Sequence, residues 1–132
     1  MKPRIYLAGY VGETAYRQYV KDHYGKKVIA FDPISDIEHN LDTDVRNNFP
    51  IVDEEKKIIE SNTDVLVAYI RRFTIGTTME IMHAYNHSIP VFIITPNVEF
   101  RKDLWLAYHA SRFYSSIDDC FRYIISLIPE QI

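Results

Sequence analysis

The chain has 132 residues, of which 47% are hydrophobic and 25% are charged, which is enough apolar material for the core of one domain. Fifteen Lys and Arg against eighteen Asp and Glu give a formal charge of -3, which argues against a polynucleotide or an anionic membrane as a partner. Cys120 is the one cysteine, which excludes an internal disulfide framework and a cysteine-rich zinc site. The sequence shows neither a signal-peptide pattern nor an apolar run of about 20 residues. We therefore expect one cytoplasmic domain over residues 1–132.

Short apolar runs alternate with stretches of helical periodicity along the chain. In chain order, the sequence predicts a strand at 4–9, a helix at 13–24, a strand at 28–31, a helix at 51–60, a strand at 64–70, a helix opening near Thr77, a strand at 90–95 and a helix at 116–128. Polar residues 35–48 are many for a simple connection and are typical of a functional loop or lid. Ser116, with Asp119 three residues later, predicts the start of the last helix. In the helix at 51–60, residues 53–57 should face outward, and the inward residues should be Ile51, Val52, Ile58 and Ile59.

This alternation of strands and helices predicts an α/β domain. The runs at 64–70 and 90–95 are almost continuously apolar, as expected of strands that are buried on both faces of a parallel sheet. In such a sheet, ligands bind beyond the carboxyl ends of the strands, where the strand order reverses. Four connections are therefore candidate ligand sites, namely those after Gly9, around Asp32, after Ile70 and after Thr95.

The segment 74–85 (TIGTTMEIMHAY) lies after the third predicted strand and contains a prominent carboxylate. Thr77 and Glu80 have the spacing of a capping box, in which Glu80 would reach back to the start of its helix. The free amides of the same turn would also help to keep a catalytic carboxylate ionised. Gly76, just before it, allows a ligand to approach the backbone closely. The spacing alone leaves both interpretations of Glu80 open.

Three motifs in order, at 5–9 (IYLAG), 64–68 (DVLVA) and 75–80 (IGTTME), resemble the nucleoside 2-deoxyribosyltransferase family. The resemblance runs from residue 4 to about residue 96, and the stretch at 105–110 (WLAYHA) is similar to small relatives of that family. Together with the strand and helix pattern, it leads us to expect a single-domain flavodoxin/Rossmann-like sandwich. We expect a five-stranded, mainly parallel sheet with helices on both faces.

The resemblance also implies catalytic roles for three residues. Glu80 corresponds to the family's nucleophile, which attacks the anomeric carbon of the sugar and leaves a covalent glycosyl-enzyme. Asp64 would grip the sugar hydroxyls or help to protonate the leaving base, and Tyr6 would hold an oxygen of Glu80 by a hydrogen bond. In such a retaining site, the two carboxylates lie roughly 5 Å apart.

One position departs from the transferase pattern. The transferases usually carry an aspartate six residues before the nucleophile, where this chain has Thr74. A short hydroxyl side chain there resembles the branch of the superfamily that hydrolyses 2'-deoxynucleoside 5'-monophosphates. The glycines of segment 9–14 would then form a phosphate seat at a helix N-terminus. The negative charge of Glu13 would repel a phosphate at this seat, so the positive charge of Arg17 or Arg46 would have to compensate for it.

We expect the ligand to be a small nucleoside or nucleotide. The expected substrate contacts are Gly9, Gly12, Thr74, Gly76, Thr77, Arg17, Arg46, Tyr108 and His109. Tyr108 and His109 are included because family members admit residues of a neighbouring subunit at the site, so that the resemblance implies a homodimer or a higher homo-oligomer.

Metal ions and cofactors are not expected. His83 and His87 have the i, i+4 spacing of zinc ligands, but the residues between them lack the glutamate of a metalloprotease motif. The aspartates in and near the long polar stretch do not have the spacing of a calcium loop. They are Asp32, Asp36, Asp42 and Asp44.

The expected activity is hydrolysis of the N-glycosidic bond in a nucleoside or, preferentially, a deoxynucleoside 5'-monophosphate. Three alternatives remain open at this point. They are transfer of deoxyribose between bases, a non-catalytic nucleotide-binding domain, and cleavage of a larger nucleotide such as NAD.

Overall fold

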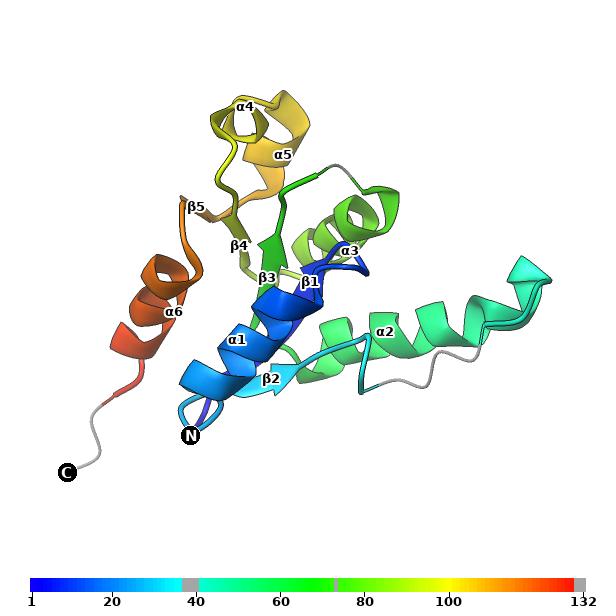
Figure 1. Cartoon of the computed structure of the whole chain (residues 1–132), viewed down its shortest axis with the longest axis horizontal. Helices are drawn as coiled ribbons and strands as arrows, with labels where there is room; N and C mark the ends of the chain where they lie inside the picture. Colours follow the sequence, from blue (N-terminus) through cyan, green and yellow to red (C-terminus); the bar gives the residue numbers. More distant parts are fainter. Residues whose placement is uncertain (37–40, 73, 130–132) are drawn as a thin grey trace.

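The computed structural model describes residues 1–36, 41–72 and 74–129, and in these ranges it contains a five-stranded sheet (Figure 1). The strands are β1 (Arg4–Gly9), β2 (Ile29–Phe31), β3 (Val65–Tyr69), β4 (Val91–Ile94) and β5 (Arg112–Tyr114). All neighbouring strands pair in parallel, in the order β2-β1-β3-β4-β5. This is a flavodoxin-like order. The predicted fold class is confirmed, and the sheet is parallel throughout.

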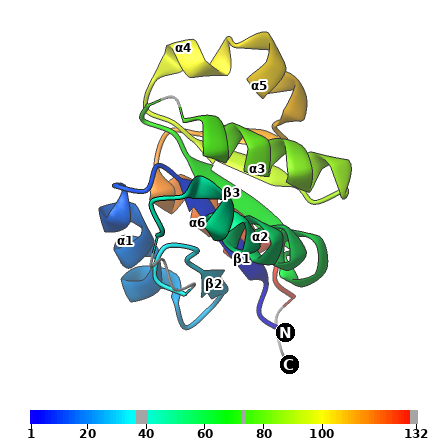
Figure 2. The same cartoon turned by 90° about the vertical axis from the view of Figure 1, so that its right-hand side faces the viewer.

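Helices cover both faces of this sheet (Figure 2). They are α1 (Thr14–Tyr24), the 3-10 helix η1 (Val45–Asn48), α2 (Phe49–Asn62), α3 (Ile75–Asn86), α4 (Val98–Arg101), α5 (Leu104–His109) and α6 (Ile117–Ser126). The side chains of β1 alternate between the two faces, as the pleat requires. Ile5 and Leu7 join the core beneath α1 and α6, whereas Tyr6 and Ala8 join the core beneath α2 and α3.

Two of the predicted helices differ from expectation at their starts. Helix α2 is longer than 51–60, and the predicted inward side chain of Val52 is exposed, whereas Ile59 is buried. Val52 lies in the first turn of α2 and borders the cleft described below, and Figure 1 shows that this end of α2 extends beyond the sheet together with η1. Helix α3 begins at Ile75, two residues before the predicted start at Thr77.

The C-terminal third of the chain was predicted only in part. The hydroxyl of Ser116 accepts a hydrogen bond of 3.1 Å from the amide of Asp119, so that the predicted cap of α6 is confirmed. Helices α4 and α5 and strand β5 had no clear sequence signal. Strand β5 has only three residues, and its pairing with β4 defines it.

The described part of the chain holds no helix that is both long and apolar enough to cross a membrane. The longest helix is α2, and it presents Glu54, Lys56 and Lys57 to solvent.

Candidate active site

A cleft of about 420 Å³ opens at the carboxyl ends of β1, β2 and β3. The chain leaves β1 toward β2 on one side and later returns to β3 on the other, so the cleft lies where the strand order reverses. Its walls come from the loop after β1, the start of α3 and the middle of α2. We call it the Glu80 cleft. Of the predicted site residues, those that line it are Gly9, Arg17, Thr74, Gly76, Thr77 and Glu80.

Three side chains from three different elements meet at the wall of this cleft, which Glu55 and Glu80 line. Tyr6, on β1, is fully buried and points toward the face that α2 and α3 cover. Its hydroxyl oxygen lies 2.5 Å from Oε2 of Glu80 on α3 and 3.3 Å from Oε2 of Glu55 on α2. The hydrogen bond expected between Tyr6 and Glu80 is therefore present, and a second carboxylate shares the same hydroxyl.

The shared hydroxyl fixes how far apart the two carboxylates can be. Because both lie within hydrogen-bonding reach of one oxygen, their Oε2 atoms are within about 6 Å of each other. Carboxyl pairs in retaining glycosidases lie about 5 to 5.5 Å apart, and those of inverting enzymes about 6.5 to 9.5 Å apart. The spacing of Glu55 and Glu80 suits covalent catalysis through a glycosyl-enzyme.

Burial controls the protonation of Glu80 and Tyr6. Burial raises the pKa of Glu80 from 4.5 to about 7, against the hydrogen bond from Tyr6, while the charge of Glu55 raises it further and that of Arg17 lowers it. Burial, together with the two carboxylates, raises the pKa of Tyr6 far above its usual range. Tyr6 therefore stays protonated and donates, and Glu80 is poised between its two forms near neutral pH.

The structure rules out the predicted cap. Glu80 is the sixth residue of α3, one turn beyond the free amides, and Thr74 occupies the N-cap position without a side-chain cap bond. Thr77 is a buried residue inside the helix. The expectation that first-turn amides keep Glu80 ionised is therefore wrong, and burial instead favours its neutral form.

The structure also removes Asp64 from the site. Asp64 immediately precedes β3, at the amino-terminal edge of the sheet, and does not line the Glu80 cleft. Its carboxylate accepts from the backbone amide of Arg4 at 2.7 Å and from the Arg4 guanidinium at 3.1 Å, and this guanidinium lowers the pKa of Asp64. The catalytic role predicted for Asp64 is contradicted because parallel strands carry ligands at their opposite ends.

Glu55 is the functional residue that sequence reasoning missed. It falls in the range 53–57 that was predicted to face outward, yet its side chain reaches Tyr6. One signal was available, since Glu55 lies four residues before Ile59 and shares its helix face. Lys56 and His83 also line the Glu80 cleft and were not predicted to do so.

The loop after β1 is built around an inward-facing arginine. The guanidinium of Arg17, only 1% exposed, donates to the carbonyl oxygens of Gly9 at 3.0 Å and Tyr10 at 3.1 Å, and its Nε lies 3.5 Å from Oδ1 of Asp32. Arg17 lines the Glu80 cleft as predicted, but its guanidinium holds the loop in place, so the donors that it directs at the carbonyl oxygens are not free for a phosphate. Gly9 has a φ of +154°, a conformation that favours glycine.

Gly12 and Arg46, unlike Gly9 and Arg17, do not line the cleft. A Cβ atom on Gly12 would lie 2.6 Å from the ring of Tyr10, so the glycine serves the packing of the loop. Arg46 is on η1, which lies beside the start of α2 and away from the sheet in Figure 1, and it pairs with Asp44 at 3.0 Å. The role predicted for Arg46 in binding a phosphate is wrong for this reason.

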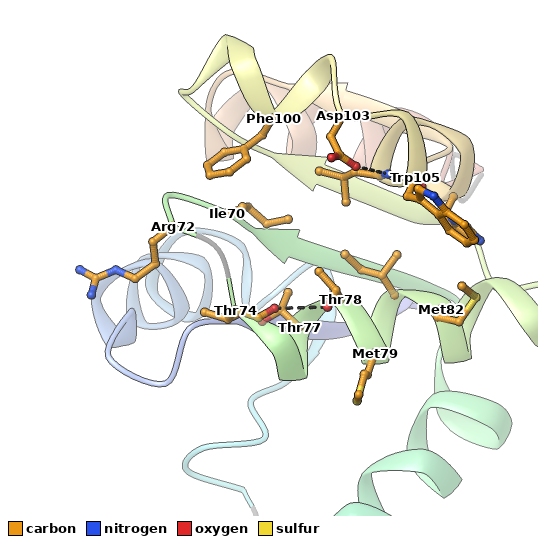
Figure 3. A pocket seen from close by; sticks show the side chains of 13 residues that line it. Ile70, Arg72, Thr74, Thr77, Thr78, Met79, Met82, Phe100, Asp103 and Trp105 are labelled. Carbon is orange, nitrogen blue, oxygen red and sulfur yellow. Dashed lines mark hydrogen bonds between the residues drawn. The ribbon is translucent and has the colours of Figure 1, made fainter.

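A second cavity of about 500 Å³ lies on the other side of α3, between that helix and α4 and α5 (Figure 3). Figure 3 shows Phe100 and Asp103 above it and Thr74 and Thr77 below. His109 lines this cavity and not the Glu80 cleft. Tyr108 lines neither and is 69% exposed, so within one chain the two residues do not reach the predicted site.

Two solved structures cover nearly the whole chain. One is a conserved protein from Enterococcus faecalis V583, with 18% identity, a TM-score of 0.75, and coverage of 97% of this chain and 100% of the other. The second is a 2-deoxyribosyltransferase from the psychrotolerant bacterium Bacillus psychrosaccharolyticus, with 15% identity, a TM-score of 0.67, and coverage of 97% and 99%. No protein-family model matches the sequence, and no curated protein matches it. The chain has the 2-deoxyribosyltransferase-like fold that its three motifs predicted.

Proposed function

We propose that this protein is a retaining N-glycosidase that cleaves the bond between base and sugar in a small nucleoside or nucleoside 5'-monophosphate. The observation that carries the proposal is the contact of Tyr6 with both Glu80 and Glu55 in one cleft. A partly buried pair of carboxyl groups at the carboxyl edge of a parallel sheet suits glycosyl transfer.

Each residue has a distinct role in the proposed reaction. The reaction starts from the form in which the proton shared by the two carboxyl groups lies on Glu55 and Glu80 is ionised. Glu80 then attacks C1' of the sugar while the C1'–N bond breaks, and Glu55 gives its proton to the departing base. Tyr6 holds the attacking oxygen in line through its hydrogen bond. Water then attacks C1' and loses a proton to Glu55, and the ester bond to Glu80 breaks. The products are the free base and the sugar, and both carboxyl groups return to their starting forms.

The walls of the cleft bear on the substrate. Lys56 lines the cleft from α2 and supplies a positive charge for a 5'-phosphate, the part that Arg17 and Arg46 do not play. Thr74, which lines both cavities, replaces the carboxylate that a base-exchanging enzyme is expected to carry. These features favour a monophosphate as substrate and water as acceptor.

A product analysis tests this proposal. Wild-type protein is incubated with the common nucleosides and 5'-monophosphates, in deoxy and ribo forms, and released bases are separated by liquid chromatography. We expect base release by wild type and by Asp64→Asn, none by Glu80→Ala, and strongly reduced release by Glu55→Gln. Asp64→Asn is the matched control, because it removes a carboxylate that lies outside the cleft.

Transfer of the sugar to a second base is the other candidate, favoured by the likeness of fold to a 2-deoxyribosyltransferase. Adding a second free base to the same reactions separates the two activities. Formation of a new nucleoside would show that the sugar is transferred to the second base, and transfer would then replace hydrolysis as the proposed activity. No base release from any substrate would leave a nucleotide-binding domain without turnover.

The proposed enzyme is a homo-oligomer. Its support is a group of large apolar side chains exposed on α3 and α5, namely Ile75 at 67%, Met79 at 67%, Leu104 at 80%, Trp105 at 71% and Tyr108 at 69%. Monomers rarely leave such groups in water. Light scattering coupled to size-exclusion chromatography should give at least a dimer, and Trp105→Glu should shift it toward monomer. A wild-type monomer would contradict this part of the proposal.

A further inference from the structure

Three side chains with metal-ligating atoms meet on the surface between α2 and α3. Nε2 of His83 lies 2.8 Å from Oε1 of Glu60, and Nε2 of His87 lies 3.6 Å from the same oxygen. The two imidazole rings are 4.4 Å apart. One ligand atom of each residue lies within 4.8 Å of the others. The sequence analysis weighed His83 and His87 without Glu60, since Glu60 comes from another helix.

The hydrogen bond of His87 decides what its second nitrogen can do. Nδ1 of His87 lies 2.9 Å from the backbone carbonyl oxygen of His83, so Nδ1 carries a proton and donates it. In the neutral ring, Nε2 then presents a lone pair to the carboxylate of Glu60. A lone pair and a carboxylate oxygen repel each other, and either a proton on Nε2 or a metal ion between the two atoms removes this repulsion. Metal-binding histidines use the same arrangement, in which the outer N–H is fixed by a carbonyl.

We propose that Glu60, His83 and His87 form a binding site for a zinc-class divalent metal ion. Zinc binds imidazole nitrogen at about 2.0 to 2.1 Å and carboxylate oxygen at about 2.0 to 2.2 Å, which places neighbouring ligand atoms about 3.4 Å apart in a tetrahedron. The two nitrogen–oxygen distances, 2.8 and 3.6 Å, bracket that value. Small side-chain rotations would complete the shell, with water as the fourth ligand.

The ligand set selects the kind of metal. Two imidazoles and one carboxylate suit zinc, copper or nickel, whereas calcium and magnesium prefer oxygen ligands throughout. The site is open to incoming ions, since the side chains are 35% exposed for Glu60, 18% for His83 and 40% for His87. Of these metals, we assign zinc because the site offers no thiolate for copper(I) and has the ligands of an open zinc site.

The proposed metal site lies beside the Glu80 cleft, on the same two helices. Glu60 follows Glu55 on α2, and His83 follows Glu80 on α3, each within about one turn and a half. His83 also lines the Glu80 cleft. A bound ion would therefore join the two helices that carry the carboxylate pair, at the rim of the cleft. We expect zinc to raise the melting temperature whether or not the protein turns over a nucleotide.

Calorimetric titration with Zn²⁺ tests the site. The untagged full-length protein, first treated with chelator, should bind one Zn²⁺ with micromolar or tighter affinity, and Co²⁺ should give visible absorption bands of a low-coordinate ion. His87→Ala and Glu60→Gln should each weaken Zn²⁺ binding at least about tenfold and abolish the zinc-dependent rise in melting temperature. His87 is half exposed and Glu60→Gln retains a hydrogen-bond acceptor for His83, so both variants should fold.

His23→Ala is the matched control. His23, on α1, also places its Nδ1 3.0 Å from a carbonyl oxygen four residues earlier, that of Tyr19, and no ion pair to a carboxylate is found for it among the described residues. This variant should bind Zn²⁺ as wild type does. The proposal is overturned if wild type binds Zn²⁺ only at millimolar concentration, or if His87→Ala and Glu60→Gln bind it as tightly as His23→Ala.

Discussion

Replacing Glu80 by glutamine should stabilise the fold above neutral pH while it abolishes catalysis. Burial raises the pKa of Glu80 from 4.5 to about 7, so the folded protein holds the proton more tightly than the unfolded chain does. Wild type therefore loses stability as the pH rises from 4.5 through 7. At about 1.4 kcal/mol for each pH unit, the cost of ionising Glu80 above pH 7 is about 3 kcal/mol. Glutamine accepts the hydrogen bond of Tyr6 without this cost.

Urea denaturation between pH 4 and pH 8.5 measures the difference. We expect the free energies of unfolding of wild type and Glu80→Gln to agree below pH 4.5 and to separate by about 3 kcal/mol above pH 7. In thermal scans this corresponds to roughly 10 °C, at about 3 to 5 °C per kcal/mol for a chain of this size.

Asp64→Asn serves as the control of opposite sign. The Arg4 guanidinium lowers the pKa of Asp64, so this carboxylate stabilises the fold above its unfolded pKa and the contribution disappears as the pH falls. The variant should therefore be slightly less stable than wild type at neutral pH. A stability difference for Glu80→Gln that does not change with pH, or a loss of stability at pH 8, would refute the reasoning for Glu80.

Three further predictions concern the cleft. Glu55→Gln should lower kcat for base release at least about 100-fold, the usual contribution of a general acid, while Asp64→Asn leaves kcat unchanged; equal effects would refute the role of Glu55. The acid limb of kcat/KM should lie near pH 7 in wild type, where Glu80 ionises. The hydrogen bond from Tyr6 lowers the pKa of Glu80 in wild type, so Tyr6→Phe should raise this pKa and move the acid limb to higher pH. A Cβ on Gly76 would meet no atom within 4 Å, so Gly76→Ala should raise the melting temperature because alanine has the higher helix propensity. The same methyl group should raise KM because it would keep the substrate from the backbone of residue 76. An unchanged KM would mean that substrate does not approach this backbone.

The local sequence was sufficient where a structural element depends on its own residues. The continuous apolar runs at 64–70 and 90–95 became β3 and β4, since only a strand covered on both faces tolerates such a run. Ser116 caps α6 as its spacing to Asp119 required. Tyr6 and Glu80 were also identified correctly as partners, although through the family motifs rather than through spacing.

Tertiary structure decided which second carboxylate joins Glu80. On the sequence, Asp64 stands in a recognisable motif and Glu55 lies in a charged stretch of a helix. Parallel packing sends the start of β3 to the edge opposite the cleft, where Arg4 binds Asp64. The same packing lays α2 beside α3 and turns Glu55 toward Tyr6.

The sequence by itself determined the class of fold, the edge of the sheet that carries the candidate site and the identity of Glu80 as a candidate nucleophile. Only the tertiary structure could assemble the groups around it, because side chains on separate elements meet through the packing of those elements. Glu60 lies 23 residues before His83, and no local pattern announces their contact. The pKa of Glu80 has the same origin, since the burial that raises it is supplied by residues distant in the sequence.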